Sequence, residues 1–137
     1  MADSRAVEDI IWSHEIAIYE GRGEGSLENY LRVAHEDFAG WPPHWSTPSD
    51  YNSMEAQNDA AQSLRGEKVD LLKKQIVVTG DIALAYYSTH RTRLGGGEVV
   101  DQHFDVLHVW GVYDGEWKLI GGMAREVSGE PRPLPPR

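Results

Sequence analysis

Cysteine is absent from this sequence, and its absence removes three kinds of chemistry. A chain without thiols forms no disulfide, has no thiolate nucleophile and offers no sulfur ligand to a metal ion. The sequence also lacks any apolar run near the roughly 20 residues of a membrane-spanning helix. Residues 1–9 carry no basic stretch followed by an apolar one, so they do not resemble a secretory signal. We therefore expect a cytoplasmic protein with no membrane partner.

Positive charge is scarce as well. The chain has 13 Lys and Arg residues against 22 Asp and Glu residues, which gives a net charge of −9. Nucleic-acid binding usually needs a basic patch, because neutralised phosphates supply much of the affinity. The densest basic pairs are Lys73 with Lys74 and Arg91 with Arg93, and neither has interleaved aromatic side chains that could stack on bases. We expect no nucleic-acid partner.

The sequence does contain the pattern of a single α+β domain. Its 137 residues suit one hydrophobic core. Apolar residues recur at helical spacing over residues 4–20, and Ser26 is a candidate N-cap for a second helix. Thr47 is the candidate N-cap of a third helix, which is expected to end near Gly66. Between the last two helices, residues 38–41 predict a short strand.

From residue 68 the apolar period changes to two. This period predicts four long strands, over residues 68–79, 82–94, 99–113 and 116–127. Glycine-containing turns separate them, as in antiparallel hairpins. Helices that precede such a meander collect on one face of its sheet. The domain is expected over residues 1–128, and four prolines within residues 129–137 predict an extended, disordered tail.

Several short motifs occur in an order that is informative as a set. They are Trp12 with Glu15, His-Glu-Asp-Phe-Ala-Gly-Trp-Pro at 35–42, Val78 to Ala83, and Val109 to Lys118. Over residues 5–127 this order resembles the nuclear-transport-factor-2-like superfamily, in particular its SnoaL-like branch. The resemblance implies a cone-shaped domain, usually a homodimer. In it, a curved antiparallel sheet packs on three N-terminal helices around a central pocket.

The resemblance leaves the function open, because this fold serves many activities. Related proteins include ketosteroid isomerases, polyketide cyclases, limonene epoxide hydrolases and scytalone dehydratases, and also non-catalytic ligand binders and oligomerisation modules. Steroid isomerases place an Asp just after the first short strand. The corresponding segment here, Trp41 to Trp45, contains no carboxylate. Epoxide hydrolases use an Arg-x-Asp, for which the nearest match is His103-x-Asp105. These departures argue against both activities in their known forms.

His108 is the first candidate for chemistry. The family comparison puts it on the pocket face of its strand, together with Phe104 and Trp110. The ordinary pKa of an imidazole is about 6.5, so it can give and take protons near neutral pH. Such a group suits general acid–base work in an apolar pocket. The alternative is a core histidine that hydrogen-bonds a neighbour. Gly121 and Gly122, inside the last strand, indicate a bulge or bend that makes room for a ligand.

His90 is the second catalytic candidate. By the same comparison Tyr86, Ser88 and His90 face the pocket from the preceding strand. The resemblance makes a histidine pair suggestive, because scytalone dehydratases use two histidines with tyrosines to remove water from a cyclic ketone.

The hairpin register decides whether the two histidines meet. A tight turn at Gly96 places His90 opposite Gln102 and leaves the rings of His90 and His108 roughly 20 Å apart, at about 3.3 Å per residue. A wider loop centred nearer Val99 brings them close. The sequence leaves both registers open.

Further substrate-binding candidates lie outside the long strands. Trp41, His44 and Trp45 surround two prolines at what the resemblance suggests is the pocket mouth. They either stack on a flat ligand or form a plug that closes the cone. Tyr19 and Tyr51 either reach the pocket from the first and third helices or pack in the core.

No metal site is expected from the sequence. His103-x-Asp105-x-x-His108 superficially resembles a ligand cluster, but side chains alternate along a strand, so His108 points away from the other two. The outer face of the sheet is instead expected to carry cross-strand ion pairs among Arg91, Arg93, Asp101 and Asp105.

These features favour a cofactor-free lyase or isomerase that acts on a small apolar cyclic or aromatic molecule. His108, with His90 or a tyrosine, would move protons on a carbon beside a carbonyl or phenol. Dehydration, retro-aldol cleavage and cyclisation all suit such a pocket. The alternative is a non-catalytic domain for small-molecule binding or dimerisation.

Overall fold

The computed structural model describes residues 3–128, so the predicted tail at 129–137 lies outside the described residues. The elements in chain order are α1 (Ser4–Gly23), α2 (Glu28–Val33), β1 (Ala34–Trp41), β2 (Ser49–Asp50), α3 (Tyr51–Gln57), the 3-10 helix η1 (Asn58–Leu64), β3 (Lys68–Thr79), β4 (Ile82–Arg93), β5 (Val99–Tyr113) and β6 (Glu116–Val127). Among these residues, no helix combines the length and apolar character that crossing a membrane requires.

All six strands belong to one sheet with the order β2-β1-β6-β5-β4-β3. Strands β3 to β6 form the predicted antiparallel meander. The prediction of a wholly antiparallel sheet is wrong for β1, which runs parallel to β6. A tight hairpin forces antiparallel pairing, but β1 follows a helix and is free to enter the sheet in the other direction.

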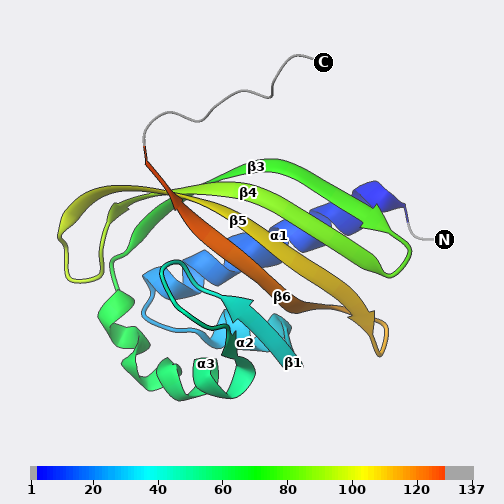
Figure 1. The fold of residues 1–137 in the computed structure, drawn as a ribbon, viewed down its shortest axis with the longest axis horizontal. Coiled ribbons are helices and arrows are strands. Elements are labelled where there is room, and N and C mark those ends of the chain that lie inside the picture. The colour runs from blue at the N-terminus through cyan, green and yellow to red at the C-terminus, as the bar shows by residue number, and fades with distance from the viewer. Residues whose placement is uncertain (1–2, 129–137) are drawn as a thin grey trace, which may run out of the picture.

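The sheet curves over the helices. Figure 1 shows α1 crossing behind the long strands, with α2 and α3 gathered beside β1. α1 buries Val7, Ile11, Glu15 and Ile18, spaced four, four and three residues apart, which is one face of a helix. This face packs against inward side chains of the sheet such as Trp110. The predicted α+β cone is confirmed.

The third helix begins later than predicted. Asp50, and not Thr47, is its N-cap, since the Asp50 carboxylate accepts the backbone N–H of Ser53 at 2.8 Å. Ser49 and Asp50 themselves pair with β1 as the short strand β2, so the chain is still extended where the helix was expected. The helix then continues as the 3-10 helix η1.

Candidate functional site

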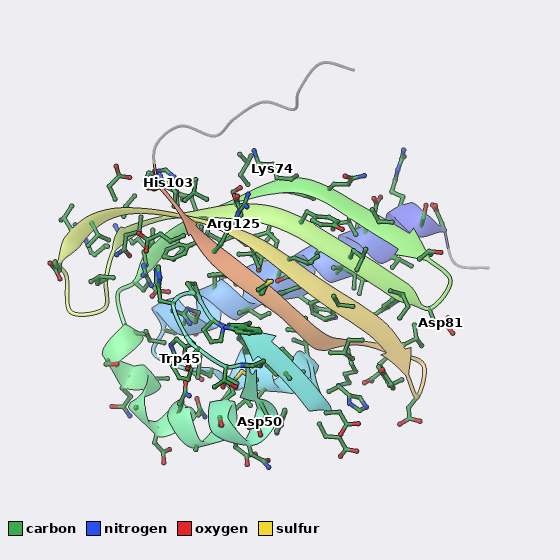
Figure 2. The ribbon with its side chains drawn as sticks, in the orientation of Figure 1. Trp45, Asp50, Lys74, Asp81, His103 and Arg125 are labelled. Atoms are coloured by element: carbon green, nitrogen blue, oxygen red, sulfur yellow. The ribbon has the colours of Figure 1, made fainter. Side chains whose placement is uncertain are left out.

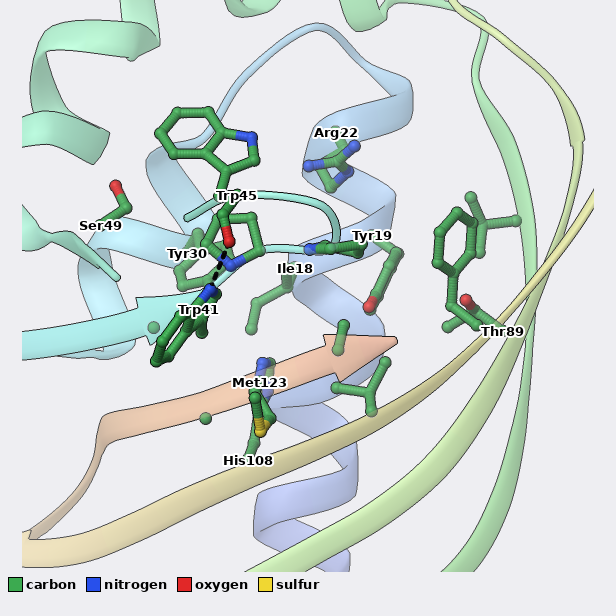
Figure 3. Close-up of a pocket in the computed structure, with 18 of the residues that line it drawn as sticks. Ile18, Tyr19, Arg22, Tyr30, Trp41, Trp45, Ser49, Thr89, His108 and Met123 are labelled. Carbon is green, nitrogen blue, oxygen red and sulfur yellow. Dashed lines mark hydrogen bonds between the residues drawn. The ribbon is translucent and has the colours of Figure 1, made fainter. Parts of the chain in front are cut away.

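A cavity of about 520 Å³ lies between the sheet and the helices. Its walls are mainly apolar, with Ile18, Leu27, Phe38, Phe104 and Val106 among the lining residues. Figure 3 shows His108 and Met123 on the sheet side of the cavity and Tyr19 and Arg22 on α1. The same elements therefore supply both an apolar interior and a small number of polar groups, as in most small-molecule sites.

The most unusual group beside this cavity is the carboxylate of Glu15, which is 0% exposed. It accepts hydrogen bonds from the Tyr87 hydroxyl at 2.8 Å and from Nε1 of Trp110 at 3.0 Å. Nδ1 of His108 lies 2.8 and 2.9 Å from its two oxygens. A buried charge is tolerated only with such partners, so these three side chains account for the burial of Glu15.

This contact orients His108 and selects its tautomer. The Glu15 oxygens already accept from Tyr87 and Trp110, so a proton on Nδ1 of His108 completes the set of donors around this carboxylate. Nε2 then holds a lone pair, and no hydrogen-bond partner for it is found among residues 3–128. Because His108 lines the cavity, the arrangement presents a positioned base to a bound molecule.

The rings of Tyr30 and Tyr87 lie beside the imidazole. Tyr19 and Tyr87 are linked through their hydroxyl oxygens at 3.2 Å. Burial raises the pKa of Tyr19 to about 12, and burial with the nearby Tyr19 and Glu15 raises the pKa of Tyr87 well above its usual range. Burial also raises the pKa of Tyr30, whose ring meets that of His108 edge-on at 6.3 Å. All three tyrosines therefore remain protonated, hydrogen-bond-donating groups near neutral pH.

Tyr30 differs from the other two because its hydroxyl has no hydrogen-bond partner in the described part of the chain. It lines the cavity beside His108. The free hydroxyl can therefore donate to an oxygen of a bound molecule. Sequence patterns alone did not single out Tyr30 as a site residue.

A second polar cluster lines the cavity away from His108. The Glu67 side chain is 2% exposed and contacts Arg22 through Nε at 2.9 Å and Nη2 at 3.1 Å. Arg91 reaches Glu67 at 3.4 Å and Gln102 at 2.7 Å. Two guanidinium groups share one carboxylate, so this region carries a net positive charge. The prediction that Arg91 lies on the outer face is wrong.

An aromatic rim is formed by the segment after β1. Nε1 of Trp41 donates to the backbone oxygen of Trp45 at 2.6 Å, the dashed bond in Figure 3. His44 has a left-handed backbone (φ 69°), and its Nε2 lies 3.0 Å from Glu126 on β6. All three predicted residues line the cavity, while Trp41 and Trp45 are 39% and 51% exposed. Side chains this exposed are better explained as a rim that a ligand contacts than as a buried plug.

The pocket role predicted for His90 and Tyr86 is wrong. His90 pairs with His103 and not with Gln102, a shift of one residue from the tight-turn register. A shift of one moves a side chain to the opposite face of the sheet. The inward positions of β4 are taken by residues such as Tyr87, and Tyr86 and His90 point outward with Ser88. His90 and His108 therefore do not meet on one face.

Two further candidates do not line the cavity. Tyr51 packs against the core from α3. Trp110 is fully buried, stacks on His14 at 5.6 Å and holds Glu15 through its indole N–H. Its strand face is as predicted, but its ring packs against α1 residues and does not line the cavity. The predicted residues that do line the cavity are Tyr19, Trp41, His44, Trp45, Phe104 and His108.

Gly122 fits closely against His108. A Cβ at this position would lie 2.7 Å from Cδ2 of His108 and would overlap the carbonyl oxygen of Leu107. The predicted irregularity exists, since the β5–β6 register shifts beside Val109. Gly122 lines the cavity, and its missing Cβ leaves room for the Leu107 carbonyl oxygen and the His108 ring.

Gly122→Ala is expected to displace the His108 ring and to destabilise the fold by about 1–3 kcal/mol, the usual effect of overpacking. Urea unfolding and the ring resonances of His108 in NMR spectra would measure the two effects. Gly23→Ala adds a methyl group on α1 against a single carbonyl oxygen at 3.2 Å and serves as the control. Unchanged His108 resonances in Gly122→Ala would contradict the packing described above.

Comparison with known proteins supports the fold independently. No family model matches the sequence, and no curated protein matches it either. Among solved structures, a proposed dehydratase of the nuclear-transport-factor-2-like family from Streptomyces avermitilis is similar with a TM-score of 0.80 and 19% identity. The similarity covers 93% of this chain and 100% of that one.

Two other solved structures agree with this result. A ketosteroid isomerase-like protein from Erwinia carotovora atroseptica has a TM-score of 0.73 and 15% identity, over 88% of this chain and 96% of that one. A protein of unknown function from Pseudomonas putida has a TM-score of 0.72 and 13% identity, over 90% and 89%. The chain has the nuclear-transport-factor-2-like fold, and these low identities establish no more than the fold.

Proposed function

We propose that the protein is a cofactor-free lyase or isomerase in which His108 moves protons on a small organic substrate. The observation that supports this most strongly is the contact between Glu15 and His108. A fully buried carboxylate holds an imidazole that lines a cavity of about 520 Å³. A histidine base must be both oriented and stabilised when it becomes charged, and a buried carboxylate against its Nδ1 does both.

The proposed chemistry gives His108, Glu15 and Tyr30 one role each. Nε2 of His108 takes a proton from a carbon next to a carbonyl group. The Glu15 carboxylate stabilises the imidazolium that forms, and the Tyr30 hydroxyl donates to the carbonyl oxygen as negative charge develops there. The imidazolium then returns its proton to a leaving hydroxyl, which departs as water, or to a second carbon, which completes an isomerisation.

The cavity also suggests a substrate class. Its apolar walls and aromatic rim suit a cyclic or aromatic skeleton. The net positive charge of the Arg22, Glu67 and Arg91 cluster suits an electron-rich oxygen group on the same molecule. A small cyclic ketone or phenol with a further oxygen substituent meets both conditions.

Mass spectrometry provides the first test. Wild-type protein and His108→Ala are incubated with a library of aromatic and polyketide-like compounds and with a metabolite extract. Consumption of a compound by the wild type alone is expected. Loss of water identifies dehydration, lighter fragments identify cleavage, and a product of unchanged mass with a different chromatographic retention identifies isomerisation. His35→Ala, a histidine on β1 outside the cavity, is the matched control and is expected to behave like the wild type.

The alternative function is ligand binding without turnover. It is favoured if compounds bind to the wild type unchanged and if His108→Ala binds them equally well. The same comparison therefore separates the two functions. Homodimer formation, which the family resemblance implies, stays a prediction that size-exclusion chromatography with light scattering can test.

A further inference from the structure

Three polar side chains meet on the outer face of the sheet, away from the cavity. Nε2 of His90 lies 2.7 Å from Oδ1 of Asp101, and Nε2 of His103 lies 3.0 Å from the same oxygen. The neighbours of His90 and His103 along their strands line the cavity, so these two side chains point the other way. In Figure 2, His103 lies on the opposite side of the sheet from Trp45.

The two imidazoles are held in parallel. His90 and His103 are direct cross-strand partners, and their rings stack with centroids 4.2 Å apart and planes 11° apart. This stacking directs both Nε2 atoms toward one point. Asp101 precedes His103 by two residues, and the β4–β5 register shift between Arg91 and Arg93 lies directly beside it. Such bulges re-aim a side chain, here toward the two imidazoles.

We propose that His90, Asp101 and His103 bind a divalent transition-metal ion of the zinc type. Two imidazole nitrogens and one carboxylate oxygen are ligands that Zn²⁺, Ni²⁺ and Cu²⁺ accept, whereas Mg²⁺ and Ca²⁺ prefer oxygen ligands alone. The three ligand atoms lie within 4.8 Å of one another. Bonds of about 2.0–2.2 Å to a central ion require separations of this order, so small side-chain rotations are enough.

Hydrogen bonding alone gives a weaker account of this cluster. Both Nε2 atoms contact one carboxylate oxygen of a residue that is 78% exposed, where ion pairs stabilise a fold very little. A metal ion satisfies all three groups at once. The imidazole protons then reside on Nδ1, and each Nε2 offers its lone pair to the ion.

The surrounding charges favour a cation. Asp70 on β3 lies directly across from His90 and adds a second nearby carboxylate. Asp105 is already engaged by Ser88 at 2.9 Å and by Arg125 at 3.0 Å, so it balances that arginine and is not available as a ligand. Three protein ligands leave at least one coordination position for water.

Isothermal titration of the untagged, full-length protein with zinc chloride tests the proposal. One ion per chain is expected, and His103→Ala and Asp101→Asn should each weaken binding by about tenfold or more. His35→Ala is the matched control, because His35 lies outside the cavity and near one carboxylate, that of Asp37 at 3.8 Å. Its zinc affinity is expected to equal that of the wild type.

NMR spectroscopy locates the ion without relying on a variant. Paramagnetic Ni²⁺ is expected to broaden the ring resonances of His90 and His103 and to leave those of His108 unaffected. The proposal is overturned if the wild type takes up no stoichiometric zinc, if His103→Ala binds it as tightly as the wild type, or if Ni²⁺ broadens the histidines indiscriminately. Each outcome is independent of whether the cavity is catalytic.

Discussion

Glu15→Gln is expected to lower turnover by roughly 10²–10⁴-fold, the range that general acid–base groups contribute. The carboxylate accepts from Tyr87 and Trp110 and contacts Nδ1 of His108. A glutamine has one acceptor oxygen and one NH₂ group, so its NH₂ must face at least one of these donors. The amide also lacks the negative charge that holds the ring proton on Nδ1 and stabilises the imidazolium.

The fold should respond to the same change. An unsatisfied buried polar group costs about 1–3 kcal/mol, and the effect on unfolding in urea should fall in that range. Glu20→Gln is the matched control, since Glu20 lies exposed on the same helix. Its stability and turnover are expected to match those of the wild type.

The tautomer of His108 can be read without a substrate. Long-range ¹H–¹⁵N NMR spectra are expected to show the proton on Nδ1 in the wild type and a mixture of tautomers in Glu15→Gln. A wild-type proton on Nε2, or spectra that the substitution leaves unchanged, would contradict the assignment of His108 as a base positioned by Glu15.

The strands were predicted accurately because their signals are local. The observed bounds of β3 to β6 agree with the sequence-based bounds to within one residue. Gly80 and Gly115 adopt positive φ angles of 56° and 78° in the hairpin turns, a conformation that glycine favours. Turn chemistry and an apolar period of two therefore specify where each strand begins and ends.

Of the Glu15–His108 pair, only His108 was predicted as a site residue, because the pair depends on a long-range contact. Glu15 and His108 are 93 residues apart in the chain. The sequence did contain signals for Glu15, which belongs with Trp12 to a motif of the family resemblance and lies four residues after Ile11 and three before Ile18 in the buried stripe of α1. A carboxylate at a core position needs a partner. Which strand supplies that partner follows only from how α1 crosses the sheet.

His90 illustrates how a register step of one residue moves a side chain to the other face of the sheet. Its own strand was predicted correctly, but the sequence left its register against β5 open. The structure pairs His90 with His103, one residue from the Gln102 partner of the tight-turn register. That single step moves His90 out of the pocket and beside another histidine. The expected absence of a metal site rested on ligands within one strand, and the argument about His108 holds, since it faces the cavity. The cross-strand cluster with Asp101 cannot be read from one strand alone.

His108→Ala should lower turnover as strongly as Glu15→Gln, and combining the two should lower it no further. If Glu15 acts only by positioning His108, removing the imidazole leaves the carboxylate nothing to position. The rates of wild type, both single variants and the double variant on a compound consumed by the wild type measure this non-additivity. Arg91→Gln provides the contrast, because Arg91 contacts the other polar cluster and its effect should multiply with that of His108→Ala.

The same cycle can be measured in the free energy of unfolding, which requires no substrate. Residues in direct contact show coupling energies of about 0.5–3 kcal/mol, whereas distant residues are additive. Glu15 and His108 are expected to fall in the first group, because Glu15→Gln should destabilise His108→Ala less than it destabilises the wild type. Additive effects on both turnover and stability would mean that the two side chains act separately, and the buried carboxylate would then need a purely structural explanation.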